Sequence, residues 1–228
     1  MKQLALDFDL APLPRLANFV SAGNEAALAH LGLWVDNPLR SPVPTYLWGE
    51  SGSGKSHLLH AVAGELMARG SAVGWLDASV LMPPTFDNQW DVVCLDDCHL
   101  YTAEQQAAAF NWFVNAQTPV EGRARWVLAA GAAPPADLKL REDLRTRLGW
   151  GQVFQLQGLS EANRRAVLRR AADGRGVVLT DEVMDFMLSR FSRDLSSLMQ
   201  LLEYLDRFAM RTQRAITIPL IKAMLENE

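Results

Sequence analysis

"GESGSGKS", residues 49–56, decides the fold of this chain. It has the form GxxxxGKS and lies between a predicted strand, "TYLW" at 45–48, and a predicted helix, "KSHLLHAVAGELMARG" at 55–70. Its glycines allow successive backbone N–H groups to point inward, and the positive end of the following helix adds to their attraction for phosphate. Lys55 is expected to reach the β- and γ-phosphates, and the Ser56 hydroxyl to ligate Mg²⁺. The stretch predicts a phosphate-binding loop (P-loop) rather than a glycine-rich turn without a ligand.

Strands and helices alternate around this loop. Short apolar strands are predicted at 72–77, 91–96 and 124–130, and helices at 24–35 and 103–117. Strands that alternate with helices imply crossover connections and a mostly parallel sheet with both faces covered. The sequence therefore predicts a three-layer α/β domain of the P-loop NTPase class.

The character of the chain changes at Ser160. Beyond it, four helical patterns follow one another with no predicted strand between them. Ser160, Thr180 and Thr217 are the candidate N-caps of three of these helices, because their hydroxyls can accept hydrogen bonds from the first turn. The expected divisions are a flexible tail, an α/β domain and a small helical domain, at residues 1–12, 13–158 and 159–228.

Two carboxylates end the predicted strand "VVCLDD" at residues 92–97. Asp96, at the carboxyl end of a strand that follows the loop, stands where a P-loop protein holds Mg²⁺. Asp97 is a candidate to orient or activate the attacking water. A solvated turn is the alternative for an isolated Asp-Asp pair, and the position after a P-loop favours the metal site.

Three arginines, Arg141, Arg145 and Arg147, lie on a predicted helix that runs into a Gly-Trp-Gly turn. Several arginines on one helix often form only a solvated face. From the residues alone, this alternative and a functional role stay equally open.

Composition limits the classes of partner. The 228 residues carry 22 Lys and Arg against 26 Asp and Glu, a net charge of −4, so no broad positive field is available to hold nucleic acid. Any contact with DNA is therefore expected to be local or through a partner, and the expected route is indirect, through the sliding clamp. No apolar run is long enough to span a bilayer and no signal peptide is recognised, so we expect a cytoplasmic protein without membrane contact. Cys94 and Cys98 lack the further ligands of a zinc site and are interpreted as core residues.

The strings "NFVSAGNEAA", "YLWGESGSGKSHLLHAVAGEL", "VVCLDD" and "RTRLGWGQV" together resemble the AAA+ module of the DnaA family of replication proteins. The resemblance covers about residues 17–228 and is strongest to the Hda branch, whose members inactivate the DnaA initiator. It implies an AAA+ nucleotide-binding domain followed by a helical lid. It also implies that Phe19, Val20 and Asn24 contact adenine, and that Arg147 is an arginine finger acting on ATP held by a neighbouring subunit.

The resemblance implies a bound adenine nucleotide with Mg²⁺, and whether ADP or ATP is the working form stays open. Ser56 and Asp96 are the expected metal ligands. The remaining expected nucleotide contacts are Gly49, Glu50, Ser51, Gly52, Ser53, Gly54, Lys55, Ser56 and His57.

The sequence departs from the family pattern at two places. The fourth predicted strand ends in Ala129 to Ala133, where the family usually has a polar residue that helps to position water, so the chain's own ATP hydrolysis is expected to be weak. The lid has Ser196, with Arg193 close by, where the family offers an arginine to the phosphates. No helix-turn-helix domain follows the lid, so we do not expect an origin-binding initiator.

The N-terminal strip "KQLALDF", residues 2–8, resembles the sliding-clamp-binding peptide of Hda proteins. An extended segment can insert apolar side chains into a pocket while a glutamine binds at the rim. A frayed terminus or an edge strand is the alternative. The expected contacts with the clamp of DNA polymerase III are Gln3, Leu4, Leu6 and Phe8.

Two functions fit the sequence. The first is a regulator that docks on the DNA-loaded clamp and promotes hydrolysis of ATP bound to the DnaA initiator, with Arg147 and Asp97 as its catalytic residues. The second is an autonomous AAA+ ATPase of the helicase-loader type. A DNA-binding transcription regulator is weaker, since neither a basic surface nor a recognition module is predicted. A homodimer stays open, as does a role of Trp48 or Trp150 at an interface.

Overall fold

The computed structural model describes residues 13–37, 42–119, 122, 124–191 and 195–226. They belong to two compact units, Leu13–Gly158 and Leu159–Glu228. Each unit has hydrophobic core residues of its own.

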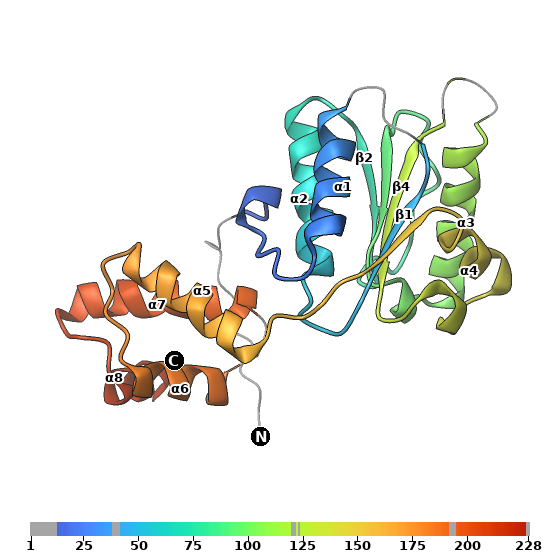
Figure 1. The fold of residues 1–228 in the computed structure, drawn as a ribbon. Coiled ribbons are helices and arrows are strands. Elements are labelled where there is room, and N and C mark those ends of the chain that lie inside the picture. The colour runs from blue at the N-terminus through green and yellow to red at the C-terminus, as the bar shows by residue number, and fades with distance from the viewer. Residues whose placement is uncertain (1–12, 38–41, 120–121, 123, 192–194, 227–228) are drawn as a thin grey trace. The chain divides into compact units, whose positions relative to one another are not determined.

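The first unit is built on a five-stranded sheet (Figure 1). Its strands are β1 Thr45–Trp48, β2 Val73–Leu76, β3 Val92–Leu95, β4 Trp126–Gly131 and β5 Gln152–Gln155. The strand order is β2-β3-β4-β1-β5, and every neighbouring pair is parallel. Because the carboxyl ends of parallel strands meet at one edge, the segments that follow β1, β3 and β4 come together there.

Helices cover both faces of this sheet. They are α1 Glu25–Asp36, α2 Lys55–Ala68, α3 Ala103–Gln117 and α4 Glu142–Leu148. Figure 1 shows α1 and α2 on one side of the sheet and α3 and α4 on the other. Successive side chains of β3 alternate between the two layers: Val92 and Cys94 pack in one core cluster, and Val93 and Leu95 in the other. The predicted three-layer α/β fold is confirmed.

Strand β5 is the element that the sequence did not predict. It has four residues, begins and ends with an exposed glutamine, and pairs on one side only, with β1. A short edge strand lacks the continuous apolar run that marks a buried strand. The register of the pairing, from Thr45 opposite Gln152 to Trp48 opposite Gln155, fixes β5 to the sheet.

The second unit consists of helices α5 Glu161–Asp173, α6 Asp181–Arg190, α7 Leu195–Thr212 and α8 Ile218–Glu226. The three predicted N-caps are confirmed at α5, α6 and α8. Ser160 Oγ accepts from the backbone N–H of Asn163, and Thr180 and Thr217 accept in the same way at 3.4 Å. Apolar side chains from all four helices form the core of this unit, including Leu168, Met184, Leu202 and Ile221.

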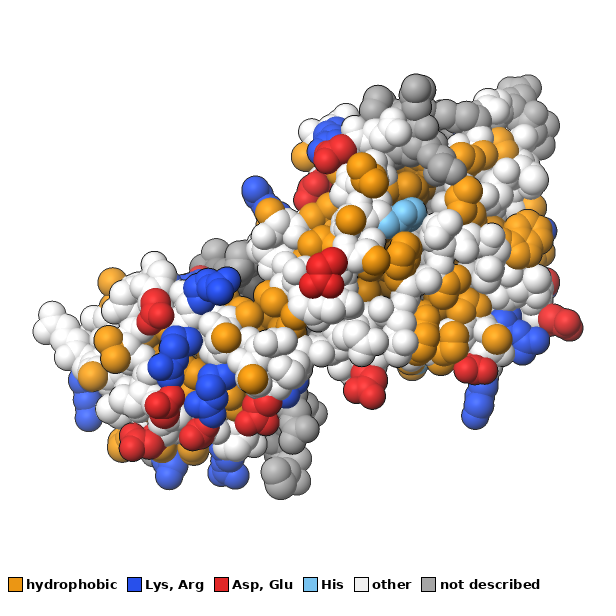
Figure 2. Space-filling view, in the orientation of Figure 1, with side chains coloured by type: hydrophobic (Ala, Val, Ile, Leu, Met, Phe, Trp, Pro, Cys, Tyr) orange, Lys and Arg blue, Asp and Glu red, His pale blue; other side chains and the backbone are white. Residues whose placement is uncertain are grey.

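Charged side chains of opposite sign are interleaved on the face of the helical unit that Figure 2 shows. Arg169 pairs with Asp181 at 2.5 Å, and Arg165 pairs with both Asp181 and Asp185. These exposed pairs contribute little to stability and form a solvated face. None of the helices in the described ranges is both long and apolar enough to cross a bilayer.

Candidate nucleotide-binding site

The P-loop connects β1 to α2 and is closely packed by its surroundings. Gly52 and Gly54 have φ of 76° and 92°, a left-handed conformation that favours glycine. A Cβ atom on Gly54 would lie 2.5 Å from the Phe19 ring, and one on Gly49 would lie 2.4 Å from the carbonyl oxygen of Leu156. Both backbone conformation and space therefore require glycine in this loop.

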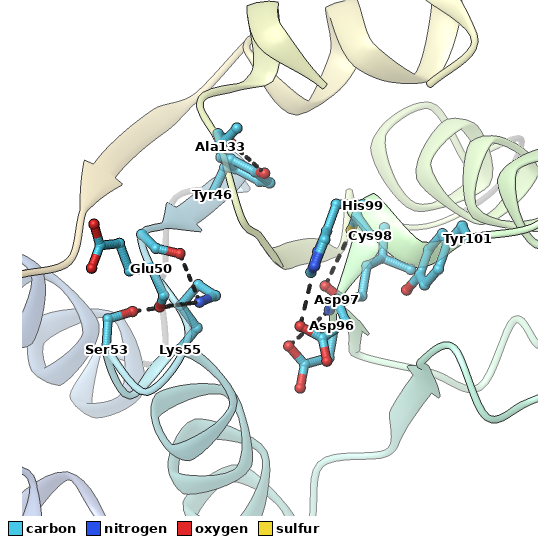
Figure 3. A network of polar contacts seen from close by, with 12 residues as sticks. Tyr46, Glu50, Ser53, Lys55, Asp96, Asp97, Cys98, His99, Tyr101 and Ala133 are labelled. Carbon is cyan, nitrogen blue, oxygen red and sulfur yellow. Dashed lines mark hydrogen bonds and ion pairs between the residues drawn. The ribbon is translucent and has the colours of Figure 1, made fainter. Parts of the chain in front are cut away.

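Lys55 is buried at the first turn of α2, with its ammonium inside the loop. Its Nζ donates to the carbonyl oxygens of Gly49 and Glu50, both at 2.9 Å, and more weakly to Ser53 Oγ at 3.4 Å (Figure 3). Burial lowers the pKa of Lys55, while the nearby carboxylates oppose this effect. All three hydrogen-bond acceptors are neutral. A phosphate oxygen would form a stronger, charge-assisted hydrogen bond with the ammonium.

Asp96 directly follows β3 and is only 4% exposed. Burial raises the pKa of its carboxyl group, and a hydrogen bond with the Ser56 side chain acts in the opposite direction. A buried carboxylate beside a hydroxyl offers the hard oxygen donors that Mg²⁺ prefers, so this pair fits the predicted metal site. In the part of the chain that the structure describes, no three His, Cys, Asp or Glu side chains form a metal-ligand cluster. Mg²⁺ usually completes its coordination with water and phosphate oxygens.

Asp97 has an unusual backbone conformation for a non-glycine residue, with φ 49° and ψ 40°. Its backbone N–H donates to Asp96 Oδ1 at 2.9 Å. The ring of His99 faces the Asp97 carboxylate, with His99 Nδ1 4.0 Å from Asp97 Oδ1 (Figure 3). This buried nitrogen has no hydrogen-bond partner within the described ranges. Backbone strain of this kind is frequent at functional sites, and sequence reasoning did not select His99.

The end of β4 lies at the same edge of the sheet but is apolar. Tyr46, buried on β1, donates from its hydroxyl to the carbonyl oxygen of Ala133 at 2.9 Å. A Cβ atom on Gly131 would lie 2.2 Å from this hydroxyl. The tyrosine thus fills the space into which a longer side chain at the strand end would extend. The polar residue that the family pattern has at this strand end is missing among Ala129 to Ala133.

The predicted adenine segment packs against the P-loop and the chain after β5. The ring of Phe19 contacts Gly54 and lies 5.8 Å from the ring of His57. Asn24 is buried, and its carboxamide binds the backbone of Gln157 through both groups: Nδ2 donates to the carbonyl oxygen at 3.0 Å, and Oδ1 accepts from the N–H at 2.8 Å. Asn24 therefore has a structural role. Adenine contact by Phe19, Val20 and Asn24 stays a prediction.

Arg147 lies on α4, which is anchored to the core by the buried side chains of Leu144 and Leu148. Its guanidinium carbon is 4.6 Å from the ring centroid of Trp150 and 5.3 Å from that of Phe110. No carboxylate in the described ranges forms an ion pair with Arg147. The guanidinium is therefore held by aromatic rings and keeps its charge available.

Parts of this chain are similar to known proteins in sequence and in fold. The family model described as "Hda, lid domain" matches residues 161–225. Domain III of the Thermotoga maritima replication initiation protein DnaA matches with a TM-score of 0.70 and 19% identity, covering 95% of this chain and 98% of that one. The chain as a whole therefore shares its fold with domain III of DnaA, and the family match covers residues 161–225. The second unit, Leu159–Glu228, contains this match to the lid domain of Hda.

Two further structures share the AAA+ fold. DnaA of Aquifex aeolicus bound to AMPPCP matches with a TM-score of 0.63 and 23% identity, over 88% of this chain and 69% of that one. The RuvB Holliday junction branch migration motor of Thermotoga maritima matches with a TM-score of 0.63 and 17% identity, over 95% and 72%. At these identities the likeness shows the fold alone, and the family is indicated by the lid.

Some predicted residues of this AAA+ protein lie outside the described part of the chain. They are Arg193, the side chain of Ser196, and the clamp-binding residues Gln3, Leu4, Leu6 and Phe8. The AAA+ unit itself brings the P-loop, Asp96 and Asp97 to one edge of the sheet (Figure 3).

Proposed function

We propose that this chain is a regulator of replication initiation that promotes hydrolysis of ATP bound to the DnaA initiator. One observation carries the proposal: Arg147 presents a guanidinium without a carboxylate partner among the described residues, whereas the protein's own β4 end has no polar side chain. The chain thus keeps a group suited to act on another protein's nucleotide and lacks one that would assist hydrolysis of its own.

The P-loop is proposed to hold ADP or ATP. The backbone N–H groups of residues 49–56 and the Lys55 ammonium would bind the phosphates, and the Ser56 hydroxyl and the Asp96 carboxylate would hold Mg²⁺. Mg²⁺ would supply positive charge at the phosphates when bound. In this proposal the nucleotide of the regulator organises its AAA+ unit for docking, and hydrolysis takes place in the initiator.

Arg147 is proposed to act in trans. A guanidinium placed beside the transferred phosphoryl group stabilises the charge that spreads over its oxygens, and such residues accelerate hydrolysis by about 10³ to 10⁵. The positive charge must reach the partner's nucleotide without being neutralised first. The absence of an ion pair at Arg147 within the described residues meets this requirement.

The N-terminal segment is proposed to dock on the DNA polymerase III sliding clamp through Gln3, Leu4, Leu6 and Phe8. Tethering regulator and initiator near the same DNA-loaded clamp raises their effective concentration for one another, so a modest peptide affinity is enough. Contact with DNA would be indirect, in keeping with the net charge of −4.

An autonomous motor or helicase-loader ATPase is the second candidate. The close approach of His99 to Asp97 favours it, because this pair resembles a base and the group that orients it. The AAA+ fold shared with the RuvB motor is compatible with either function. A motor requires strong ATP turnover by the isolated chain, whereas the regulator requires little.

The proposal is tested by mixing the chain with ATP-loaded DnaA, clamp and DNA, and measuring conversion of the initiator's ATP to ADP. We expect stimulation that falls about a thousandfold in Arg147→Ala and is reduced when the clamp is omitted. Arg145→Ala, on the same helix, is the matched control and should retain stimulation. Stimulation that survives in Arg147→Ala would refute the proposal.

A further inference from the structure

We propose that Trp150 is a positioning residue that aims the Arg147 guanidinium at the partner's nucleotide. The inference rests on the proposed function of Arg147 and adds a residue to it. Trp150 is 60% exposed, so packing in the core does not explain why a tryptophan stands at this position of the AAA+ unit.

The guanidinium of Arg147 lies against two aromatic rings. Its central carbon is 4.6 Å from the centroid of the indole and 5.3 Å from that of Phe110, both within the range of cation–π attraction. A free arginine side chain samples many rotamers, and ordering it costs entropy at the moment of binding. The two rings restrict this freedom before the partner arrives, which is preorganisation of the reactive group.

The backbone that carries the indole is fixed on both sides. The N–H of Trp150 donates to the carbonyl oxygen of Arg147 at 3.1 Å, so the two residues are joined through the end of α4. On the other side, a Cβ atom on Gly151 would lie 1.8 Å from the carbonyl oxygen of Pro44, and Gln152 N–H donates to that same oxygen at 2.8 Å. The indole is therefore carried by an anchored turn.

Arg141 shows the alternative way of holding a guanidinium. It lies 5.1 Å from the same Phe110 ring, but its nitrogens donate to both carboxylate oxygens of Asp143, at 2.7 and 2.6 Å. Such a pair neutralises the charge and occupies the N–H donors that would bind a phosphate. Aromatic faces orient Arg147, and no side chain in the described part of the chain forms an ion pair that would occupy its N–H donors. An arginine finger that must act on another molecule's phosphate needs support from aromatic rings rather than from a carboxylate.

The first test uses the regulator alone. The Nε–Hε resonance of Arg147, assigned by its loss in Arg147→Ala, should be shifted upfield by the aromatic ring currents. In Trp150→Ala it should move toward the position of a free arginine, and in Trp150→Phe it should move less. An unchanged resonance in Trp150→Ala would overturn the inference without reference to any activity.

The second test measures initiator ATP hydrolysis as a function of regulator concentration. We expect Trp150→Ala to lower the maximal rate about tenfold, since small misplacement of a reacting group has effects of this order or larger. The half-saturating concentration should be unchanged and Trp150→Phe should restore most of the rate. Trp150→Ala should have no further effect when Arg147 is already alanine. Met67→Ala, which also removes an exposed apolar side chain of the AAA+ unit, is the matched control.

The outcomes separate the inference from the proposed function. If Arg147→Ala abolishes stimulation and Trp150→Ala leaves the maximal rate unchanged, or only raises the half-saturating concentration, Trp150 is not a positioning residue. If Arg147→Ala itself leaves stimulation intact, the proposed function is wrong and the role of Trp150 fails with it. Melting temperatures of the variants close to that of the unaltered chain would show that each rate reports on a folded protein.

Discussion

The ends of β3 and β4 lie side by side at one edge of the same sheet, yet they differ in chemistry. After β3 come Asp96, Asp97 and His99, with a buried carboxylate and a left-handed backbone. Strand β4 ends at Gly131, which packs against the hydroxyl of Tyr46, and two alanines follow it. Polar side chains thus lie at the end of β3, where a bound phosphate and Mg²⁺ would contact the protein. At the end of the neighbouring strand β4, the corresponding space is filled by the side chain of Tyr46.

The two ends also differ in their expected contribution to stability. A buried ionised carboxylate and a strained residue each destabilise the folded state unless a ligand compensates. The β4 end carries no such cost, because its tyrosine hydroxyl has an acceptor and its small residues fit the space. Functional residues often reduce stability, and the groups expected to do so here, Asp96 and Asp97, lie at the end of the site that is proposed to bind nucleotide.

The largest effect is expected from Lys55→Ala at the P-loop. The substitution removes charge-assisted hydrogen bonds to the phosphates worth up to about 3 kcal/mol, so affinity for ATP and ADP should fall about a hundredfold. Isothermal titration calorimetry measures the change directly. Lys139→Ala, an exposed lysine of the same unit, should bind nucleotide as the unaltered chain does. Equal affinities for Lys55→Ala and Lys139→Ala would show that the P-loop is not the nucleotide site.

A smaller effect is expected from Gly131→Ala at the β4 end. The added methyl group would overlap with the Tyr46 hydroxyl, and overpacking of this kind should destabilise the fold by about 2 kcal/mol. Thermal unfolding measures this change. In a Tyr46→Phe background, where the overlapping oxygen is absent, the same substitution should cost about half as much.

Gly64→Ala is the control for this cycle, because a Cβ atom there meets nothing within 4 Å in the exposed middle of α2. It should leave stability unchanged or raise it by up to about 1 kcal/mol. If Gly131→Ala were as harmless as Gly64→Ala, the β4 end would have room for a polar side chain, and the contrast between the two strand ends would be wrong.

The sequence predicted the parts of this molecule that depend on local patterns. The P-loop is recognised by eight consecutive residues, and the N-caps Ser160, Thr180 and Thr217 act as their positions indicated. The alternation of strands and helices gave the three-layer fold. These features are visible in sequence because each depends on neighbours a few residues apart.

The parts that sequence reasoning missed depend on distant residues. The Tyr46 hydroxyl donates a hydrogen bond to Ala133, which follows another strand, and Arg147 contacts the ring of Phe110 on another helix. No local sequence pattern predicts either contact. Strand β5 was missed because an edge strand needs little apolar surface. Asn24 is a further example: its hydrogen bonds to the backbone of Gln157 join residues far apart in the sequence, and its predicted contact with adenine stays a prediction.

The most direct test of the account asks whose ATP is hydrolysed. The chain and DnaA are each loaded with ATP carrying a different isotope, mixed with clamp and DNA, and followed for one turnover by separating ATP from ADP. We predict that the initiator's label appears in ADP while the chain's own label stays in ATP, and that Arg147→Ala prevents the conversion. Conversion of the chain's own label at the same rate or faster, with or without the initiator, would contradict the account and identify an autonomous ATPase.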